Sequence, residues 1–306
     1  MINDRLVDAG ELPVAVRDFG GDQPPLLLLH GAGGNLAALT GLARALRPRH
    51  RVIAVDLRGH GRSGDGAWTW DAALGDLAAV TVQMELDRPA VAGHSLGGMI
   101  AALWGQRHPE TPGVINIDGN PAPTRPEQLP GLPPEKAAAE LARLTAVFDS
   151  MEATAGASLP TDGLSAVIDQ QRAAAREAGL NEKLVIEAFR RNVVSKGGET
   201  TFRPSGWATS ELRTLMNDLD LGEVYATTPA PTLAVLATRD IPQQEPYADL
   251  YAAYRRHLVE QAAAAARTNP RLRYVSLEGT THAMALTHPE LLAQVIGDFL
   301  HGTVRA

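Results

Sequence analysis

Residues 91–99 read Val-Ala-Gly-His-Ser-Leu-Gly-Gly-Met and contain the pattern G-x-S-x-G. An apolar run, residues 89–92, leads into the pattern, and a helical pattern, residues 96–107, follows it. A serine on a sharp strand-to-helix turn needs close backbone approach on both sides, which glycine permits. Such a turn exposes the Ser95 hydroxyl and leaves the Leu96 N–H at a helix N-terminus, where negative charge is stabilised. The stretch therefore predicts a strand, a nucleophile turn and a helix.

The composition sets the class of protein. The chain has 306 residues, of which 44% are hydrophobic and 21% charged, as expected for one large globular α/β domain with an insertion. The net charge of -7 argues against nucleic acid or an anionic membrane as a partner. The chain has no cysteine, which excludes disulfides, thiol catalysis and cysteine-ligated metals. No spacing among the nine histidines indicates a metal site, so we expect neither a metal nor a cofactor.

The N-terminal residues carry no apolar segment typical of a secretory signal peptide. No uninterrupted apolar stretch in the sequence is long enough to span a bilayer. We therefore expect a cytoplasmic protein that acts on a small-molecule substrate. Monomer and homodimer both remain open.

Apolar runs alternate with helical patterns in the first and last parts of the chain. The predicted strands are residues 26–29, 51–55, 89–92, 113–117, 231–237 and 271–277. Strands that alternate with helices in this way require a parallel, doubly wound sheet. Together with a short N-terminal hairpin in residues 5–17, the pattern predicts an α/β fold with a mostly parallel sheet of about eight strands.

The middle of the chain has a different character. Residues 121–134 are rich in proline, and the patterns that follow, to about residue 220, are helical and rich in alanine, with breaks that include Lys196–Pro204. We expect an insertion of roughly four helices that caps the site. The predicted organisation is residues 1–120 as the first part of the core, 121–228 as a helical cap and 229–306 as the second part of the core.

Three polar residues follow predicted strands of the same sheet. Ser95, Asp240 and His282 each lie just after a strand, and functional groups gather at the carboxyl ends of parallel strands. A serine hydroxyl needs a base such as histidine to take its proton, and a carboxylate orients that histidine. The chain order Ser…Asp…His is typical of nucleophile-turn hydrolases. Asp118 also ends a predicted strand and is the alternative acid.

A glycine-rich turn, His30-Gly-Ala-Gly-Gly34, follows the strand at residues 26–29. No Lys-Ser/Thr pair follows the glycines, which argues against a phosphate-binding P-loop. The N–H groups of Ala32 and Leu96 are the candidate oxyanion-hole donors, and loss of one such donor typically costs about 2.7–4 kcal/mol of barrier. The candidate substrate-binding residues are Gly31, His94 and Trp207.

Four segments together resemble the α/β-hydrolase fold serine hydrolases, in particular their capped, esterase/lipase-like members. They are HGAGG at 30–34, DLRGHGRS at 56–63, GHSLGG at 93–98 and TTH at 280–282, which HPELLAQVIGDFL follows. The resemblance covers nearly all of the chain outside the insertion, and it implies the triad and oxyanion hole named above. The family's acid usually ends a G-x-x-D segment, whereas here Ala237 stands at the glycine position. Thr281 likewise precedes the histidine where glycine is usual.

A serine nucleophile disfavours dehalogenase and epoxide hydrolase chemistry, for which this family uses aspartate. We expect hydrolysis, through an acyl-enzyme, of a carboxylic ester or a lactone of a small to medium, fairly apolar molecule. An acyltransferase or perhydrolase, a C–C bond hydrolase and a non-catalytic ligand-binding protein are the alternatives.

Overall fold

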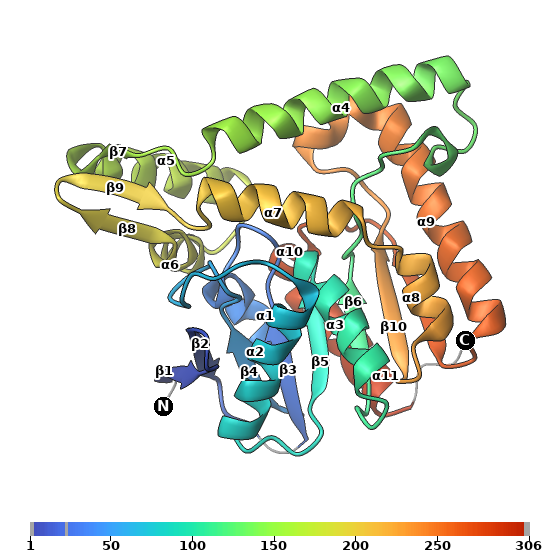
Figure 1. Cartoon of the computed structure of the whole chain (residues 1–306), viewed down its shortest axis with the longest axis horizontal. Helices are drawn as coiled ribbons and strands as arrows, with labels where there is room; N and C mark the ends of the chain where they lie inside the picture. The colour runs from blue at the N-terminus through green and yellow to red at the C-terminus, as the bar shows by residue number, and fades with distance from the viewer. Residues whose placement is uncertain (1–2, 22–23, 303–306) are drawn as a thin grey trace.

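The computed structural model describes residues 3–21 and 24–302 (Figure 1). At its centre lies one eight-stranded sheet with helices on both faces. In spatial order its strands are β1 (Asn3–Asp8), β2 (Pro13–Asp18), β4 (Arg51–Val55), β3 (Pro25–Leu29), β5 (Ala90–His94), β6 (Val114–Ile117), β10 (Thr232–Ala237) and β11 (Leu272–Leu277). The strands from β4 to β11 are parallel, and β1 and β2 add an antiparallel hairpin at one edge. The predicted fold class is confirmed.

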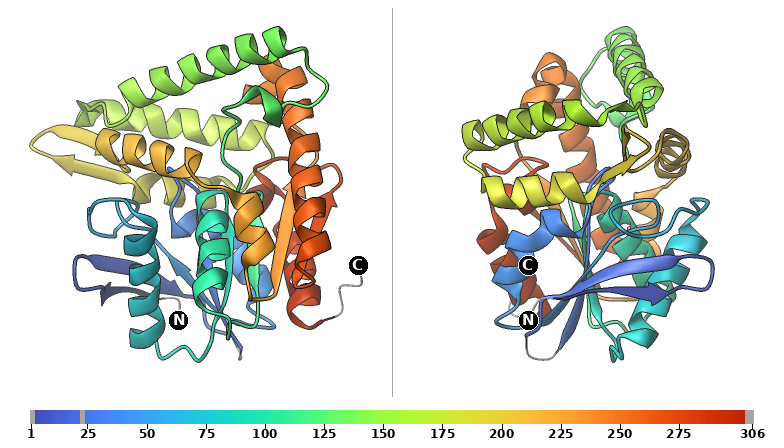
Figure 2. Two further views of the ribbon diagram at one scale, coloured as in Figure 1. Left: turned by 45° about the vertical axis from the view of Figure 1, so that its right-hand side comes forward. Right: turned by 90° about the vertical axis from the view of Figure 1, so that its left-hand side faces the viewer.

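The leucine run of β3 explains why helices cover both faces of the sheet. All four side chains are fully buried, and successive strand residues point to opposite faces. Leu27 and Leu29 pack in one apolar cluster, and Leu26 and Leu28 pack in another. The first face is covered by α2 (Trp70–Gln83), α3 (Leu96–Arg107), α8 (Leu221–Thr227) and α9 (Ala248–Thr268). The second face is covered by α1 (Thr40–Leu46) and α11 (Pro289–Leu300), as Figure 2 shows.

The segment between β6 and β10 lies over the carboxyl ends of the parallel strands (Figures 1 and 2). Its helices are α4 (Pro134–Thr154), α5 (Leu164–Glu177), α6 (Glu182–Arg191) and α7 (Gly206–Asn217). The next helix, α8, packs against α3 and α9 of the core. No helix of the described ranges, including the 21-residue α4, is both long and apolar enough to cross a bilayer. The candidate cap thus stands over the end of the sheet where the predicted site residues lie.

The insertion is not purely helical, which corrects the expectation of helices separated by plain breaks. Three short strands, β7 (Leu159–Pro160), β8 (Val193–Lys196) and β9 (Glu199–Phe202), form a small antiparallel sheet. β8 and β9 carry pairs of β-branched residues and are joined by Gly197 and Gly198, whose φ angles are 62° and 84°. Two glycines at positive φ form the two-residue turn that favours a hairpin.

Candidate active site

Ser95 lies on the turn between β5 and α3. Its φ of 53° and ψ of -120° place it in a strained region that residues other than glycine rarely adopt. The flanking glycines make the turn possible, because an added Cβ would lie 2.0 Å from the Gly97 oxygen at Gly93 and 2.6 Å from the Leu29 oxygen at Gly97. The predicted nucleophile turn is therefore formed, with the serine at the carboxyl end of β5.

His282 follows β11 and is paired with Asp118. The distance from His282 Nδ1 to Asp118 Oδ2 is 2.7 Å. Asp118 lies directly after β6, and its Oδ1 accepts a hydrogen bond of 2.9 Å from the Ala237 N–H at the end of β10. Burial by itself would raise the pKa of Asp118, but the hydrogen bond and the charge of His282 hold it below the ordinary value. The carboxylate is thus ionised and fixed at both oxygens, as the orienting member of a triad must be.

Asp240 does not occupy this position, which corrects the preference for it as the acid. Its carboxylate pairs with the Arg255 guanidinium on α9, where one contact is very short and the second, Nη2 to Oδ2, is 3.3 Å. Asp240 stands three residues beyond the end of β10, where the chain already turns toward α9. Asp118 reaches His282 across the end of β10 instead, so the alternative acid is the one that the geometry brings to the imidazole.

The glycine-rich loop after β3 packs against the serine. A Cβ at Gly31 would lie 2.9 Å from the Ser95 Cβ, and the Gly97 N–H donates to the His30 oxygen at 3.1 Å. Within the described ranges, neither Ala32 N–H nor Leu96 N–H has an acceptor. Two backbone donors on the two segments that meet at Ser95 are therefore available for an oxyanion.

His30 has a structural role under this loop. Its Nδ1 lies 2.8 Å from the Gly31 oxygen, and its Nε2 accepts from the Leu57 N–H at 3.0 Å. Burial lowers the pKa of His30 to about 4, so the ring is neutral at pH 7 and both ring nitrogens are used.

His94, a predicted substrate-binding residue, contacts His282. Its Nε2 lies 2.7 Å from the His282 carbonyl oxygen, and the two ring centroids are 4.7 Å apart. Burial, together with the charge of His282, lowers the pKa of His94 to about 4. A neutral His94 therefore donates to the backbone of His282 and helps to position it. Because His94 precedes Ser95 directly, the same contact brings His282 next to the serine turn.

Trp207 lies on α7 of the insertion, and 48% of its surface is exposed. Its assignment to a substrate pocket stays a prediction. The described residues contain no group of three or more histidines or acids that could hold a metal ion.

Sequence reasoning missed Asn116, which supports the acid. Its side chain donates to the Gly119 oxygen at 2.9 Å and accepts from the Gly119 N–H at 2.7 Å, so it clamps the turn that carries Asp118. It also donates to the Tyr225 hydroxyl at 2.7 Å. A buried amide in the otherwise apolar strand Val-Ile-Asn-Ile is the signal that could have revealed it, because buried polar groups require partners.

Comparisons with known proteins identify the family of the chain. The alpha/beta hydrolase fold family matches residues 24–289, and the chain belongs to that family. It is 27% identical over 279 residues to a pimeloyl-[acyl-carrier protein] methyl ester esterase of Yersinia enterocolitica, which covers 90% of this chain and 92% of that protein. It is 28% identical over 214 residues to the sn-1-specific diacylglycerol lipase ABHD11 of Xenopus laevis, over 69% of this chain and 62% of that protein.

A solved structure of similar fold is that of E-2-(acetamidomethylene)succinate hydrolase. It superimposes with a TM-score of 0.72 at 22% identity and covers 98% of this chain and 100% of that one. At this identity the likeness concerns the fold alone. The family match and the esterase and lipase relatives make the chain a hydrolase.

Proposed function

We propose that this chain is a serine hydrolase that cleaves a carboxylic ester or lactone of a small to medium, fairly apolar molecule. The observation that carries the proposal is the Asp118–His282 pair of 2.7 Å beside the strained turn of Ser95. Relatives named as a methyl ester esterase and a diacylglycerol lipase support ester chemistry.

In the first half-reaction the Ser95 hydroxyl attacks the carbonyl carbon of the ester while His282 takes the hydroxyl proton. Asp118 keeps the imidazole in one orientation and stabilises the imidazolium that forms. The N–H groups of Ala32 and Leu96 stabilise the negative oxygen of the tetrahedral intermediate. His282 then gives its proton to the departing alcohol, which leaves an acyl group on Ser95.

In the second half-reaction a water molecule attacks the acyl carbonyl and gives a proton to His282. The intermediate collapses, the acid leaves, and the proton returns to the Ser95 oxygen. The His282 side chain is 37% exposed and that of Asp118 is 13% exposed, so the base is open to substrate and water while the acid is shielded. The insertion, over the carboxyl ends of the strands, supplies walls for the substrate.

A fluorophosphonate probe followed by peptide mapping tests the proposal. We expect one adduct per chain on Ser95, and none in Ser95→Ala or in wild type that has been unfolded. Ester, lactone and thioester panels then define the substrate. Failure of folded wild-type protein to react would contradict an assembled serine, base and oxyanion hole.

A further inference from the structure

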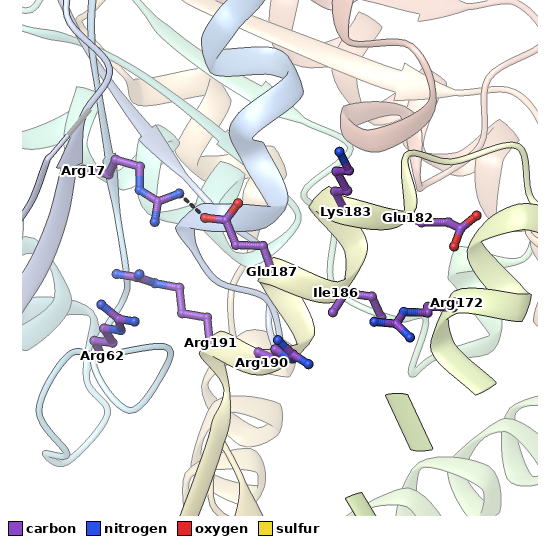
Figure 3. Close-up of a pocket in the computed structure, with 9 residues that line it drawn as sticks. All are labelled: Arg17, Arg62, Arg172, Glu182, Lys183, Ile186, Glu187, Arg190 and Arg191. Carbon is purple, nitrogen blue, oxygen red and sulfur yellow. Dashed lines mark hydrogen bonds and ion pairs between the residues drawn. The ribbon is translucent and has the colours of Figure 1, made fainter. Parts of the chain in front are cut away.

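A hollow of about 460 Å³ lies between the insertion and the edge of the central sheet (Figure 3). No residue of the candidate active site lines it. Its lining consists of six cationic residues, two acids and one isoleucine: Arg17, Arg62, Arg172, Lys183, Arg190, Arg191, Glu182, Glu187 and Ile186. In a chain of net charge -7, this concentration of positive charge is a local exception.

The inner wall of the hollow consists of guanidinium groups that are held in place. Arg17 and Arg191, whose side chains are 12% and 3% exposed, each contact a different oxygen of Asp4 at 2.6 Å. Arg62 approaches the same carboxylate at 3.5 Å, so three guanidinium groups share one acid. Arg191 also binds the buried Asp56 at 2.7 Å. Fixed donors of this kind bind an anion without a large loss of side-chain entropy.

One donor of this wall has no partner in the described ranges. The Nη2 of Arg191 is buried and makes no hydrogen bond, although its Nε and Nη1 are both used. In Figure 3 this guanidinium lies between those of Arg17 and Arg62. A buried donor without an acceptor is unfavourable, so an acceptor that reaches this nitrogen would be stabilising.

The rim of the hollow carries further, exposed cations. Arg190 and Lys183 are exposed and have no ion-pair partner among the described residues. Arg176, which pairs with Glu182, brings the six cations that line the hollow to seven. Their acidic partners are five: Asp4, Asp56, Asp169, Glu182 and Glu187. This cluster therefore has an excess of two positive charges.

Glu187 shows that the site already accepts an oxyanion. Its carboxylate lies 2.5 Å from Arg17 Nη1, and its side chain is 44% exposed. An exposed carboxylate is displaced by a ligand far more readily than the buried Asp56. Glu187 therefore acts as an internal competitor for this site.

We propose that the hollow binds a small dianion of the phosphate monoester class. The cations come from β2, from the turn after β4 and from α5 and α6, so their N–H groups converge from different directions. A tetrahedral phosphate has three terminal oxygens that suit converging guanidinium forks, whereas a planar carboxylate fills only one fork. A phosphate monoester is a dianion at pH 8, so its charge also matches the excess of two positive charges around the hollow. This site does not depend on the proposed esterase function.

Calorimetric titration of the full chain with inorganic phosphate at pH 8 and low ionic strength tests the proposal. We expect Arg190→Gln to weaken phosphate binding roughly tenfold, since it removes a charge-assisted hydrogen bond. Glu187→Gln is expected to tighten binding by a similar factor because it removes the competitor. The matched controls, Arg267→Gln and Glu260→Gln, change the net charge equally on α9 and should shift binding by less than about twofold. Thermal melts verify that each variant is folded.

Opposite effects of the two variants, with unchanged controls, would support the site. Absence of phosphate binding to wild type, or equal effects of Arg190→Gln and Arg267→Gln, would overturn it. Succinate is the dicarboxylate comparison, and succinate binding as tight as phosphate binding would overturn the phosphate class.

Discussion

The side-chain amide of Asn192 donates a hydrogen bond of 2.8 Å to the Gly33 carbonyl, next to the candidate oxyanion donor Ala32. Its side-chain oxygen accepts from the Gly61 N–H and from Asn35 Nδ2, each at 3.0 Å. One residue of the insertion thus joins two segments of the core, the loop after β3 and the turn after β4, and both its oxygen and its nitrogen are used. The loop that carries Ala32 is therefore held partly from the insertion.

Replacement of Asn192 with alanine should loosen this loop while the triad stays intact. We expect the rate of fluorophosphonate reaction at Ser95 to fall roughly tenfold, because a displaced oxyanion donor stabilises the transition state less well. Asn181→Ala is the matched control, since Asn181 caps the same helix, α6, by accepting from Lys183 and Leu184 N–H groups. It should cost about 1 kcal/mol of stability and leave the rate near that of wild type. Equal losses in both variants would assign the effect to helix stability alone.

Asp118→Asn and Asp240→Asn should separate the two candidate acids. We expect the first to lower kcat on a model ester by roughly 10³–10⁴, as loss of the orienting carboxylate does in other triads. The second breaks the pair with Arg255 and should leave kcat within a few-fold of wild type. Steady-state kinetics on p-nitrophenyl esters measures both. The reverse order of effects would restore Asp240 as the acid.

The buried histidines should make the fold sensitive to acid. Burial lowers the pKa of His30 to about 4 and that of His60 to about 3, from an ordinary 6.5. Below pH 6.5 these two histidines therefore bind protons in the unfolded chain but stay neutral in the folded chain. Stability is therefore full above pH 6.5 and falls as the pH drops toward 4, by about 1–2 kcal/mol for each histidine at pH 5.

Urea unfolding between pH 7 and pH 5 measures this loss. His60→Asn should flatten the decline, whereas the same change at the exposed His288 should not. A midpoint that stays constant over this range would show that the histidines are protonated in the folded state.

Two glycine-to-alanine changes should have opposite effects on the free energy of unfolding. At Gly97 the new methyl would lie 2.6 Å from the Leu29 oxygen, and we expect a loss of about 1–3 kcal/mol. At Gly75, inside α2, no atom lies within 4 Å, and the change should add about 0.5–1 kcal/mol through helix propensity. Denaturant melts of both variants provide the comparison. A similar change in the free energy of unfolding for both variants would argue against the close contact between Gly97 and the Leu29 backbone at the serine turn.

Much of the fold could be predicted because its signals are local. The apolar run at Leu26–Leu29 is buried on both faces, as a central parallel strand should be, and the turn at Ser95 has its glycines where the backbone crosses. The hairpin of the insertion could not be predicted with the same ease. Its strands are only four residues long, and in the sequence alone the Gly197-Gly198 pair is equally typical of a break between helices.

The class of fold, the nucleophile turn and the histidine after the last strand can all be predicted from local patterns, because each depends on spacing along a short segment. The acid that meets this histidine is known only from the folded chain, in which Asp118 lies 2.7 Å from His282. Asp118 and Asp240 both follow parallel strands, but the fold gives them different partners. Asp118 accepts from the Ala237 N–H at the end of the neighbouring strand β10, whereas Asp240 pairs with the Arg255 guanidinium of α9. The direction of a side chain at a strand end is set by these partners, and no local pattern encodes it.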